Sequence, residues 1–308
     1  MLGLVTAEVA AALDPDLLPL DAAMRARLGD DSVKIVSWDD LDVDWSVFDA
    51  VIIRSTWDYA DRLPEFLDWI RSVESETTLI NGAAAVRWST DKRYLADLAA
   101  EGIEIAPTVF VAPGEAAPDV TGLHVVKPAV GAGSNGARRC ESDEVAAHVA
   151  LLHADGHTAM VQPYLHRLDE LGETAHCFVA TPSGAGGLEL SHAFRKGAIL
   201  TSTEVAQKGG LFAEEEVDTR TPDDAELALA RRALDTAVVR GLGPIMFARV
   251  DIAPHRSADG TDSHVVMELE LIEPSFYFHT DPATVDTFAD ALDAWLAAVE
   301  SLAATGSD

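Results

Sequence analysis

The sequence predicts an α/β protein that combines a parallel sheet with an antiparallel sheet. Through residues 1–80, short apolar strands alternate with helical stretches, and this βαβ rhythm implies a parallel sheet. Later in the chain, residues 248–275 form a hairpin pattern in which apolar and polar positions alternate on both sides of a turn. The 308 residues, with 48% hydrophobic composition, are enough for a large core and for two or three subdomains.

The N-terminal elements place a polar cluster at the ligand side of the predicted parallel sheet. These elements are strands over 2–5, 33–36, 50–53 and 79–80 and helices over 20–28 and 64–73. Ligands of parallel sheets bind beyond the carboxyl ends of the strands, and the sequence RSTWDY at 54–59 directly follows the third strand. Its charged, hydroxylated and aromatic side chains are candidates for substrate contact. The alternative is a helix-capping turn that contains a buried Trp57.

The next predicted elements carry two lysines, one at the start of a helix and one at the end of a strand. Residues 89–91, Ser-Thr-Asp, predict the cap of a helix that runs to about residue 100, and Lys92 lies in its first turn. A lysine there opposes the helix dipole, so it is either solvated or directed at an anion. Strands over 107–111 and 123–126 follow, and the second of them leads directly into Lys127.

A glycine-rich segment follows Lys127, and Gly131, Gly133 and Gly136 match the pattern G-x-G-x-x-G. A dinucleotide fingerprint requires a helix that opens inside the motif, whereas an extended stretch at 137–140 follows here. We therefore expect a loop between two strands. Such a loop can act as a flexible cover whose backbone N–H groups approach phosphates, with the positive charge of Lys127 beside it. A plain glycine turn is the alternative.

The second half of the chain continues the alternation of helices and strands. Its predicted elements are a helix over 144–154, a strand over 158–162, a hairpin of 177–180 and 189–194, and helices over 223–242 and 286–303. Between the strand and the hairpin, we expect a polar loop that contains Asp169, Glu170 and Glu173. Residues 201–216 are predicted to form a surface loop.

The predicted hairpin at 248–275 carries an acidic face. If it folds symmetrically about Asp259-Gly260, a turn dipeptide, Asp251 lies opposite Glu268 and Arg249 lies opposite Glu270. Cross-strand neighbours are separated by roughly 5 Å, so three carboxylates would share one face. Oxygen clusters of this kind hold hard divalent ions, above all Mg²⁺. The alternative is an exposed sheet face in a very acidic protein.

Composition excludes several classes of protein. The formal net charge is −30, from 22 basic and 52 acidic residues, without a basic run, which argues against a nucleic-acid partner. Cys140 and Cys177 are the only cysteines, too few for a disulfide framework or a thiolate metal site. No apolar run approaches the roughly 20 residues of a membrane span, and the start of the sequence lacks a basic leader region. We therefore expect a cytoplasmic enzyme that acts on small molecules.

Taken together, these segments resemble the ATP-grasp superfamily of carboxylate–amine ligases over nearly the whole chain. Within it, the phrases RSTWDY, TDKRYL, VVKPAVGAGS, SHAFRK, RVDI and ELELIEPS are similar to those of the cyclo-ligase family that closes O-ureido-D-serine to D-cycloserine. The resemblance implies an ATP-grasp fold of three domains, with an N-terminal parallel-sheet domain at 1–90, a central lid at 91–160 and a C-terminal antiparallel-sheet domain at 161–308.

The resemblance also implies roles for individual residues. Those expected to bind ATP are Lys92, Lys127, Gly131, Gly133, Ser134, Gln162, Tyr164 and Leu165, with Asp169 or Glu170 at the ribose. The expected metal ligands are Asp251, Glu268 and Glu270, with Glu273 as an alternative because the superfamily usually has Asn at the position of Glu270. Arg249, Arg195 and Lys196 would face the transferred phosphoryl group or the substrate carboxylate. The expected substrate contacts are Arg54, Ser55, Thr56, Asp58 and Ser275.

The implied activity is an ATP- and Mg²⁺-dependent ligation, with Mn²⁺ as a possible substitute. A carboxylate would be activated as an acyl phosphate and attacked by a nitrogen nucleophile, within one amino-acid-like molecule. Ligation of two separate molecules, as in a dipeptide or γ-glutamyl ligase, is the first alternative, and a non-catalytic ATP-binding module is the second. The expected partner is a small molecule, with neither nucleic acid nor membrane, and a homodimer is the commonest assembly on general grounds.

Overall fold

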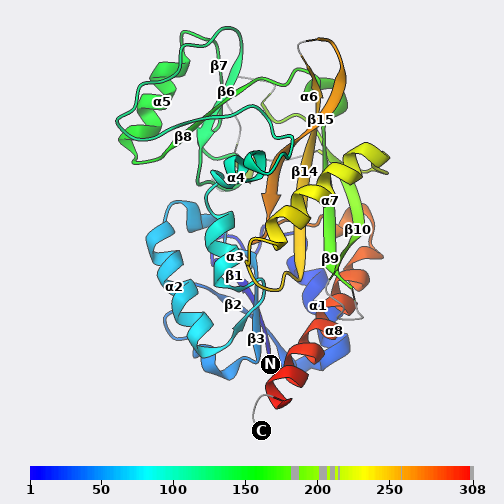
Figure 1. The fold of residues 1–308 in the computed structure, drawn as a ribbon. Helices are drawn as coiled ribbons and strands as arrows, with labels where there is room; N and C mark the ends of the chain where they lie inside the picture. Colours follow the sequence, from blue (N-terminus) through cyan, green and yellow to red (C-terminus); the bar gives the residue numbers. More distant parts are fainter. Residues whose placement is uncertain (182–186, 201–206, 209–211, 214–215, 258, 306–308) are drawn as a thin grey trace.

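The computed structural model describes residues 1–308 except 182–186, 201–206, 209–211, 214–215, 258 and 306–308. Within the described part, the strands form two four-stranded sheets, one five-stranded sheet and one two-stranded sheet. Figure 1 shows the first four-stranded sheet at the bottom, the second at the upper left and the five-stranded sheet on the right. The mixture of one parallel sheet and several antiparallel sheets confirms the predicted fold class.

The N-terminal sheet is parallel, as the βαβ rhythm predicts. Its strands are β1 (Leu2–Thr6), β2 (Val33–Ser37), β3 (Ala50–Ser55) and β4 (Thr78–Leu79), in the order β2-β1-β3-β4. The helices of this part are α1 (Leu17–Leu28) and α2 (Leu63–Glu76), with single 3₁₀ turns at Asp30–Ser32, Trp45–Val47 and Trp57–Ala60. Strands β1 and β3 are buried along their whole length, which is expected for central strands covered on both faces.

The helix predicted to end near residue 100 is α4 (Tyr94–Ala100), and an additional helix, α3 (Gly82–Ser89), precedes it. Of the predicted cap at 89–91, Asp91 accepts from the backbone N–H of Arg93 at the turn that leads into α4. Ser89 instead ends α3, and its hydroxyl donates a hydrogen bond to the carbonyl of Leu269. Lys92 therefore lies in the junction between the two helices, where its backbone N–H donates to the carbonyl of Ala129.

The central sheet is antiparallel and carries the glycine-rich loop. Its strands are β5 (Val109–Val111), β6 (His124–Pro128), β7 (Arg138–Cys140) and β8 (Ala159–Pro163), in the order β5-β8-β6-β7, and α5 (Val145–Ala154) packs against it. The glycine-rich segment connects β6 to β7, so the expected loop between two strands is confirmed. The division into domains at residues 90 and 160 stays a prediction.

The C-terminal sheet contains the predicted hairpin at its edge. Its strands are β9 (Glu173–Ala180), β10 (Leu188–Lys196), β13 (Val217–Thr219), β14 (Phe247–Arg256) and β15 (Asp262–Glu270), in the order β13-β10-β9-β14-β15. The predicted polar loop is wrong in part, because α6 (Leu168–Leu171) occupies its middle and Glu173 already begins β9. Of the predicted surface loop at 201–216, the described residues include β11 (Gln207–Lys208) and β12 (Phe212–Ala213), which pair with each other.

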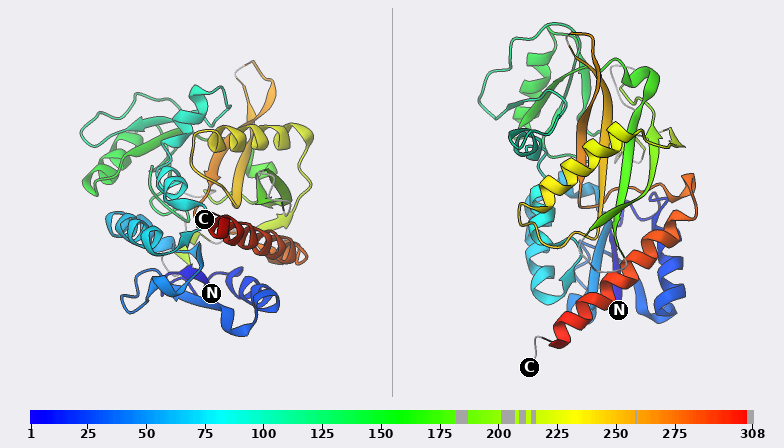
Figure 2. Two further views of the ribbon diagram at one scale, coloured as in Figure 1. Left: turned by 60° about the horizontal axis from the view of Figure 1, so that its bottom comes forward. Right: turned by 45° about the vertical axis from the view of Figure 1, so that its right-hand side comes forward.

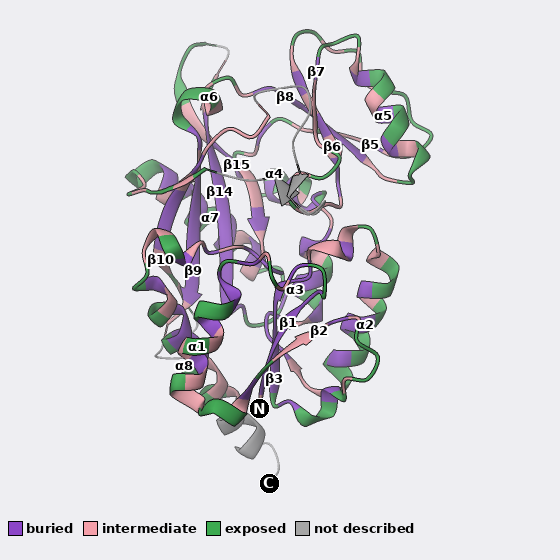
Figure 3. Ribbon diagram, turned by 180° about the vertical axis from the view of Figure 1, so that it is seen from behind, coloured by how far each residue is buried: buried purple, intermediate pink, exposed green. Residues whose placement is uncertain are grey.

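Helices cover both faces of the C-terminal sheet. Helix α7 (Asp224–Val238) begins with a capping box formed by Asp223 and Glu226 and packs on β14 and β15. Helix α8 (Thr284–Thr305) crosses the opposite face and also packs against α1, so it joins the C-terminal sheet to the N-terminal part (Figure 2). A 3₁₀ turn at Phe278–Thr280 precedes α8. Figure 3 shows that β9 and β14, which lie side by side within this sheet, are largely buried.

Asn81 holds the N-terminal sheet against the ends of β14 and β15. Its side chain is buried, and its amide nitrogen donates to the carbonyls of Phe247 and Leu271 at 2.9 and 2.8 Å. Its amide oxygen accepts from the backbone N–H of Met246 at 2.8 Å. One side chain thereby satisfies backbone groups that the strand ends would otherwise bury unpaired.

Among the described helices, none is long and apolar enough to cross a membrane.

Gly172 provides a test of the junction between α6 and β9. Its φ is +69°, and an added Cβ would lie 2.4 Å from the carbonyl oxygen of Lys196 and 2.7 Å from Nε of Arg195. Gly156 has a similar φ of +83° with nothing within 4 Å of the added atom. We expect Gly156→Ala to cost about 1–2 kcal/mol of unfolding free energy from backbone strain alone, and Gly172→Ala to cost about 1–3 kcal/mol more from overpacking. Urea unfolding of the two variants measures the difference, and equal losses would contradict this account of the junction.

Candidate active site

A cavity of about 490 Å³ lies where the three larger sheets meet. The central sheet contributes Lys127 and Gln162, and the C-terminal sheet contributes Glu173 and Glu268. From the N-terminal part, Trp57 and the neighbouring Tyr59 line the same space. A cavity of this size with convergent charged groups is typical of a small-molecule site.

The ribbon of β14 and β15 forms one wall of the cavity, with the register that its turn dipeptide predicts. Asp251 pairs with Glu268 and Arg249 pairs with Glu270. The register shifts by one residue beyond Asp251, and the predicted pairing holds on the cavity side of that shift. Carboxylate oxygens of Asp251, Glu268 and Glu270 lie within 4.8 Å of one another. The expected acidic face is therefore present, and Glu273 lies outside this group of oxygens although it lines the same cavity.

Two cations compensate the most deeply buried of these carboxylates. Asp251 is fully buried, and it accepts from Nε and Nη2 of Arg249 at 2.9 Å each and from Nζ of Lys196 at 2.5 Å. Burial alone would raise the pKa of Asp251, but Arg249 and Lys196 hold this pKa well below its usual range. Asp251 therefore carries a negative charge at neutral pH.

The pKa values of the other acidic side chains depend on how far neighbouring cations offset the effect of burial. Burial raises the pKa of Glu270 to about 7 although Arg249 contacts it at 2.5 Å. Burial and the neighbouring Glu270 raise the pKa of Glu273 to about 8. Burial also opposes ionisation of Glu268, but Lys92 at 2.7 Å and the nearby Lys127 lower its pKa. This crowding of carboxylates would be relieved by a further cation.

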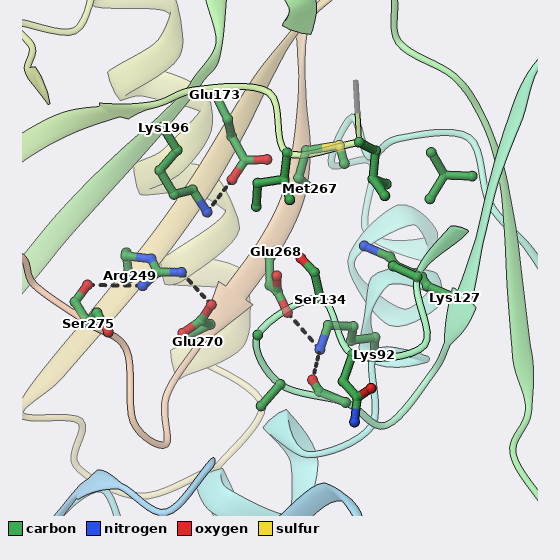
Figure 4. A pocket seen from close by; sticks show the side chains of 18 of the residues that line it. Lys92, Lys127, Ser134, Glu173, Lys196, Arg249, Met267, Glu268, Glu270 and Ser275 are labelled. Carbon is green, nitrogen blue, oxygen red and sulfur yellow. Dashed lines mark hydrogen bonds and ion pairs between the residues drawn. The ribbon is translucent and has the colours of Figure 1, made fainter. Parts of the chain in front are cut away.

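Lys92 and Lys127 face the acidic wall from the opposite side of the cavity (Figure 4). The ammonium of Lys92 contacts Glu268 and also donates to the carbonyl of Gly131 at 2.6 Å. Burial lowers the pKa of Lys127, against the attraction of Glu268. The structure therefore brings together the two lysines that the sequence analysis selects, next to the glycine-rich loop.

The glycine-rich loop borders the cavity with an unusual backbone. Gly131, Gly133 and Ser134 all line the cavity. Gly133, Ser134 and Gly136 have positive φ values of 58°, 62° and 72°. Such conformations turn backbone N–H groups toward one side of a loop, where they can contact anions.

The strand end after β8 reaches the cavity, but the acids expected beside it do not. Gln162, Tyr164 and Leu165 line the cavity. Asp169 instead accepts the hydroxyl proton of Tyr164 at 2.5 Å, and neither Asp169 nor Glu170 belongs to the cavity wall. The backbone N–H of Tyr164 donates to the carbonyl of Leu123. Of the two backbone groups of Tyr164, the carbonyl is therefore the one that a ligand can contact.

Glu173 is the cavity acid that the sequence analysis misses. Its carboxylate contacts Nζ of Lys196 at 2.5 Å, and burial raises its pKa to about 7 (Figure 4). The signal available in the sequence is its position as the first residue of the hairpin strand, opposite Lys196. The apolar pattern, which begins only at Cys177, conceals this position.

Arg54 and its neighbours from RSTWDY do not line the cavity, except through Trp57 and Tyr59. Strand β3 continues to Ser55, and the buried guanidinium of Arg54 lies 5.5–5.9 Å from three phenylalanine rings. Ser55 and Thr56 are also buried. Their assignment as substrate contacts therefore finds no support in the geometry. The alternative, a turn with a buried Trp57, holds in part, because Trp57 begins a 3₁₀ turn and packs against the core but stays partly exposed at the cavity.

Of the remaining candidate residues, some line the cavity and others do not. Asp58 accepts from Trp38 and Arg62 and lies outside the cavity wall. Arg195 also lies outside it and donates to the carbonyl of Leu171, whereas Lys196 and Arg249 line the cavity. Ser275 lines the cavity, and its carbonyl accepts from Nη1 of Arg249 at 2.9 Å.

The chain is similar to known proteins over nearly its whole length. Residues 2–81 match the family described as D-cycloserine synthetase DcsG, N-terminal domain. The chain is 37% identical over 307 residues to the cycloserine biosynthesis protein DcsG of Streptomyces lavendulae, which covers 95% of this chain and 97% of the relative. The crystal structure of D-cycloserine synthetase DcsG superimposes with a TM-score of 0.82 at 36% identity, over 96% of this chain and 99% of that one.

A more distant structure shares the fold alone. D-alanine–D-alanine ligase from Bacillus anthracis, complexed with ATP, matches with a TM-score of 0.58 at 16% identity, over 95% of this chain and 94% of that one. The identity to DcsG extends over nearly the full length of both proteins. The chain therefore belongs to the DcsG family and has the ATP-grasp fold.

Proposed function

We propose that this enzyme closes an amino-acid derivative into a ring, with O-ureido-D-serine as the substrate and D-cycloserine as the product. The observation that carries the proposal is the 37% identity, over 95% of the chain, to a protein named for cycloserine biosynthesis. The cavity adds support, because it combines lysines, an arginine and a group of carboxylates. These are the side chains that phosphoryl transfer to a carboxylate needs.

The nucleotide would occupy the side of the cavity formed by the central sheet. We assign its phosphates to Lys92, Lys127 and the glycine-rich loop, including Ser134, because these groups supply positive charge and backbone donors at one end of the cavity. Gln162 and the backbone of Tyr164 and Leu165 would contact the adenine. For the ribose hydroxyls we assign Glu173 in place of Asp169 or Glu170, because only Glu173 lines the cavity.

The acidic ribbon fits a Mg²⁺ ion. Asp251, Glu268 and Glu270 supply hard oxygen ligands within 4.8 Å of one another. Burial raises the pKa of Glu270 to about 7, and a bound cation would favour its ionised form. These three residues would hold the ion, and Mn²⁺ prefers similar ligands. When bound, the ion would neutralise charge on the phosphate oxygens.

The chain's own groups account for the rest of the chemistry. Arg249 and Lys196 place two positive charges where the substrate carboxylate would accept the terminal phosphoryl group of ATP. A nitrogen of the same substrate then attacks the activated carboxyl carbon, and the bond from that carbon to the phosphate oxygen breaks. The glycine-rich loop would exclude water from this acyl phosphate.

Formation of the ring product also requires removal of the carbamoyl group of the substrate. Ring closure transfers one carboxylate oxygen to phosphate, and the attacking nitrogen still carries the carbamoyl group of the ureido substrate. Hydrolysis of that group consumes one water and releases ammonia and carbon dioxide, which leaves D-cycloserine.

The partner is accordingly a small amino-acid-like molecule, and we retain the expectations of a cytoplasmic enzyme, without nucleic-acid or membrane partners, that forms a homodimer.

Product analysis distinguishes cyclisation from intermolecular ligation. With O-ureido-D-serine, ATP and Mg²⁺, we expect one ADP, one phosphate, one ammonia and one D-cycloserine per turnover, because a single substrate molecule supplies both reacting groups. Mass spectrometry identifies the ring, and coupled assays measure the other products. A product whose mass combines two substrate molecules would favour the dipeptide-type alternative, and phosphate release that no amino acid stimulates would contradict both.

Lys127 tests the assignment of the phosphate side. We expect Lys127→Ala to weaken ATP binding about tenfold or more, because a charge-assisted contact to phosphate is lost. Lys34 is an exposed lysine on β2 of the N-terminal sheet, and Lys34→Ala serves as the matched control with unchanged affinity. Titration calorimetry with a non-hydrolysable ATP analogue measures both dissociation constants. Wild-type affinity in Lys127→Ala would remove this lysine from the site.

Asp251 tests the metal assignment. We expect Asp251→Asn to lower kcat by about a hundredfold or more at any Mg²⁺ concentration, because a preorganised charge at the reacting groups is lost. Asp262→Asn is the matched control, since Asp262 on the same ribbon also pairs with arginines but lies outside the cavity. Circular dichroism verifies folding, and steady-state kinetics with varied Mg²⁺ provide the measurement. Full Mg²⁺-dependent turnover by Asp251→Asn would show that the ribbon does not hold the ion.

A further inference from the structure

Asp16 immediately precedes α1, but its side chain does not cap this helix. Aspartate is a favoured residue at that position because its carboxylate usually accepts from the first backbone N–H groups of the helix. Here Asp16 has helical backbone angles, and no side-chain hydrogen bond to α1 forms. The carboxylate is fully buried. Its role therefore lies outside its own helix.

The carboxylate of Asp16 accepts from three consecutive backbone N–H groups more than 250 residues away in the chain. It accepts from Phe276 at 2.6 Å, from Tyr277 at 2.9 Å and from Phe278 at 2.9 Å. Consecutive N–H groups that converge in this way form an anion-binding nest. Tyr277, at the centre, has φ +47° and ψ +52°, a left-handed conformation that residues other than glycine seldom adopt.

The segment held by Asp16 forms part of the cavity wall. Ser275, Tyr277 and His279 line the cavity at alternate positions, and Ser275 lies across the cavity from Lys127 (Figure 4). This segment, residues 275–279, therefore faces the end of the cavity that the proposed nucleotide phosphates leave open. We call it the 275–279 loop.

Two further side chains hold the carbonyl groups of the 275–279 loop. Arg249 donates to the carbonyl of Ser275 at 2.9 Å, and Nε2 of the buried His192 lies 2.7 Å from the carbonyl of Phe276. The N–H groups of Phe276, Tyr277 and Phe278 all point to Asp16. Because Asp16 fills the nest, these N–H groups do not bind a substrate carboxylate, and the positive charges at this end of the cavity come from Arg249 and Lys196.

We propose that Asp16 is a positioning residue for the amino-acid substrate. Its carboxylate fixes the 275–279 loop in the strained conformation that presents Ser275, Tyr277 and His279 to the substrate end of the cavity. This inference rests on the proposed function, in which an amino-acid derivative occupies that end. It predicts that Asp16 affects the amino-acid substrate and not ATP.

The test replaces Asp16 with Asn, which keeps the volume of the side chain but turns one acceptor into an N–H₂ donor among three N–H groups. We expect the KM for O-ureido-D-serine to rise about tenfold, the size expected for the loss of a charge-assisted hydrogen bond, while the KM for ATP stays within about twofold. A merely structural role would lower the active fraction, and hence kcat, without separating the two KM values. An unchanged KM for the amino-acid substrate would overturn the proposal.

Asp14→Asn is the matched control. Asp14 lies on the same segment and is also buried, but it accepts from the backbone N–H of Asp16 and makes no bond to the 275–279 loop. We expect Asp14→Asn to leave both KM values within about twofold of wild type, because the nest stays intact. A rise in the amino-acid KM equal to that of Asp16→Asn would show a general effect of the segment and would overturn the proposal.

Amide hydrogen exchange provides a readout that needs no substrate. In ligand-free Asp16→Asn, we expect faster exchange confined to the N–H groups of Phe276, Tyr277 and Phe278, and wild-type exchange at these groups would overturn the inference.

If the wild-type enzyme does not turn over O-ureido-D-serine, only the proposed function fails, and the KM comparison uses the amino acid that supports phosphate release. If Asp16→Asn does not fold, Asp16→Glu replaces it, because glutamate keeps the charge but moves the carboxylate by one methylene group relative to the three N–H groups. An unchanged amino-acid KM in Asp16→Glu would then overturn the proposal.

Discussion

The contact of Asp251 with Arg249 and Lys196 is the interaction on which the site depends. A fully buried carboxylate is stable only when cations and hydrogen bonds replace its hydration, and Asp251 obtains both from β14 and β10, on either side of β9. The same two cations extend to Glu270 and Glu173 at the cavity. The order and register of four strands thereby fix the positions of two cations and three carboxyl groups at one wall.

The charged side chains of the cavity pair with one another. Lys92 contacts Glu268 and the carbonyl of Gly131, so a nucleotide phosphate would compete with both for one ammonium group. Glu173, Glu270 and Glu273 have pKa values raised to about 7, 7 and 8, mainly because burial disfavours their charged forms. Binding of the proposed nucleotide and metal ion would therefore be an exchange of partners, in which an added cation and an added polyanion replace internal ion pairs.

The sequence predicts those parts of the site that local patterns determine. The pairing of Asp251 with Glu268 follows from alternation and from the Asp259-Gly260 turn, and the connection of β6 to β7 follows from the extended stretch after the glycines. Glu173 is missed because polar Thr174 and His176 interrupt the apolar pattern of β9. Thr174 is satisfied by Glu226 of α7, a partner that no local pattern reveals. Arg54 is misassigned because β3 continues to Ser55, which directs the guanidinium toward three phenylalanine rings instead of the cavity.

Asn81 and Asp16 show a further limit of local patterns and indicate how the N-terminal part acts at the site. Each has an ordinary local interpretation, as a turn residue and as a helix cap, yet each side chain binds backbone groups at least 160 residues away. Asn81 holds the ends of β14 and β15, and Asp16 holds the loop that follows β15. The segment that matches the DcsG N-terminal family, residues 2–81, contains both anchors. The N-terminal part therefore contributes to the cavity chiefly by fixing the backbone of the acidic ribbon and of the loop after it. Under the proposed function, substrate selectivity would then depend on residues that never contact the substrate.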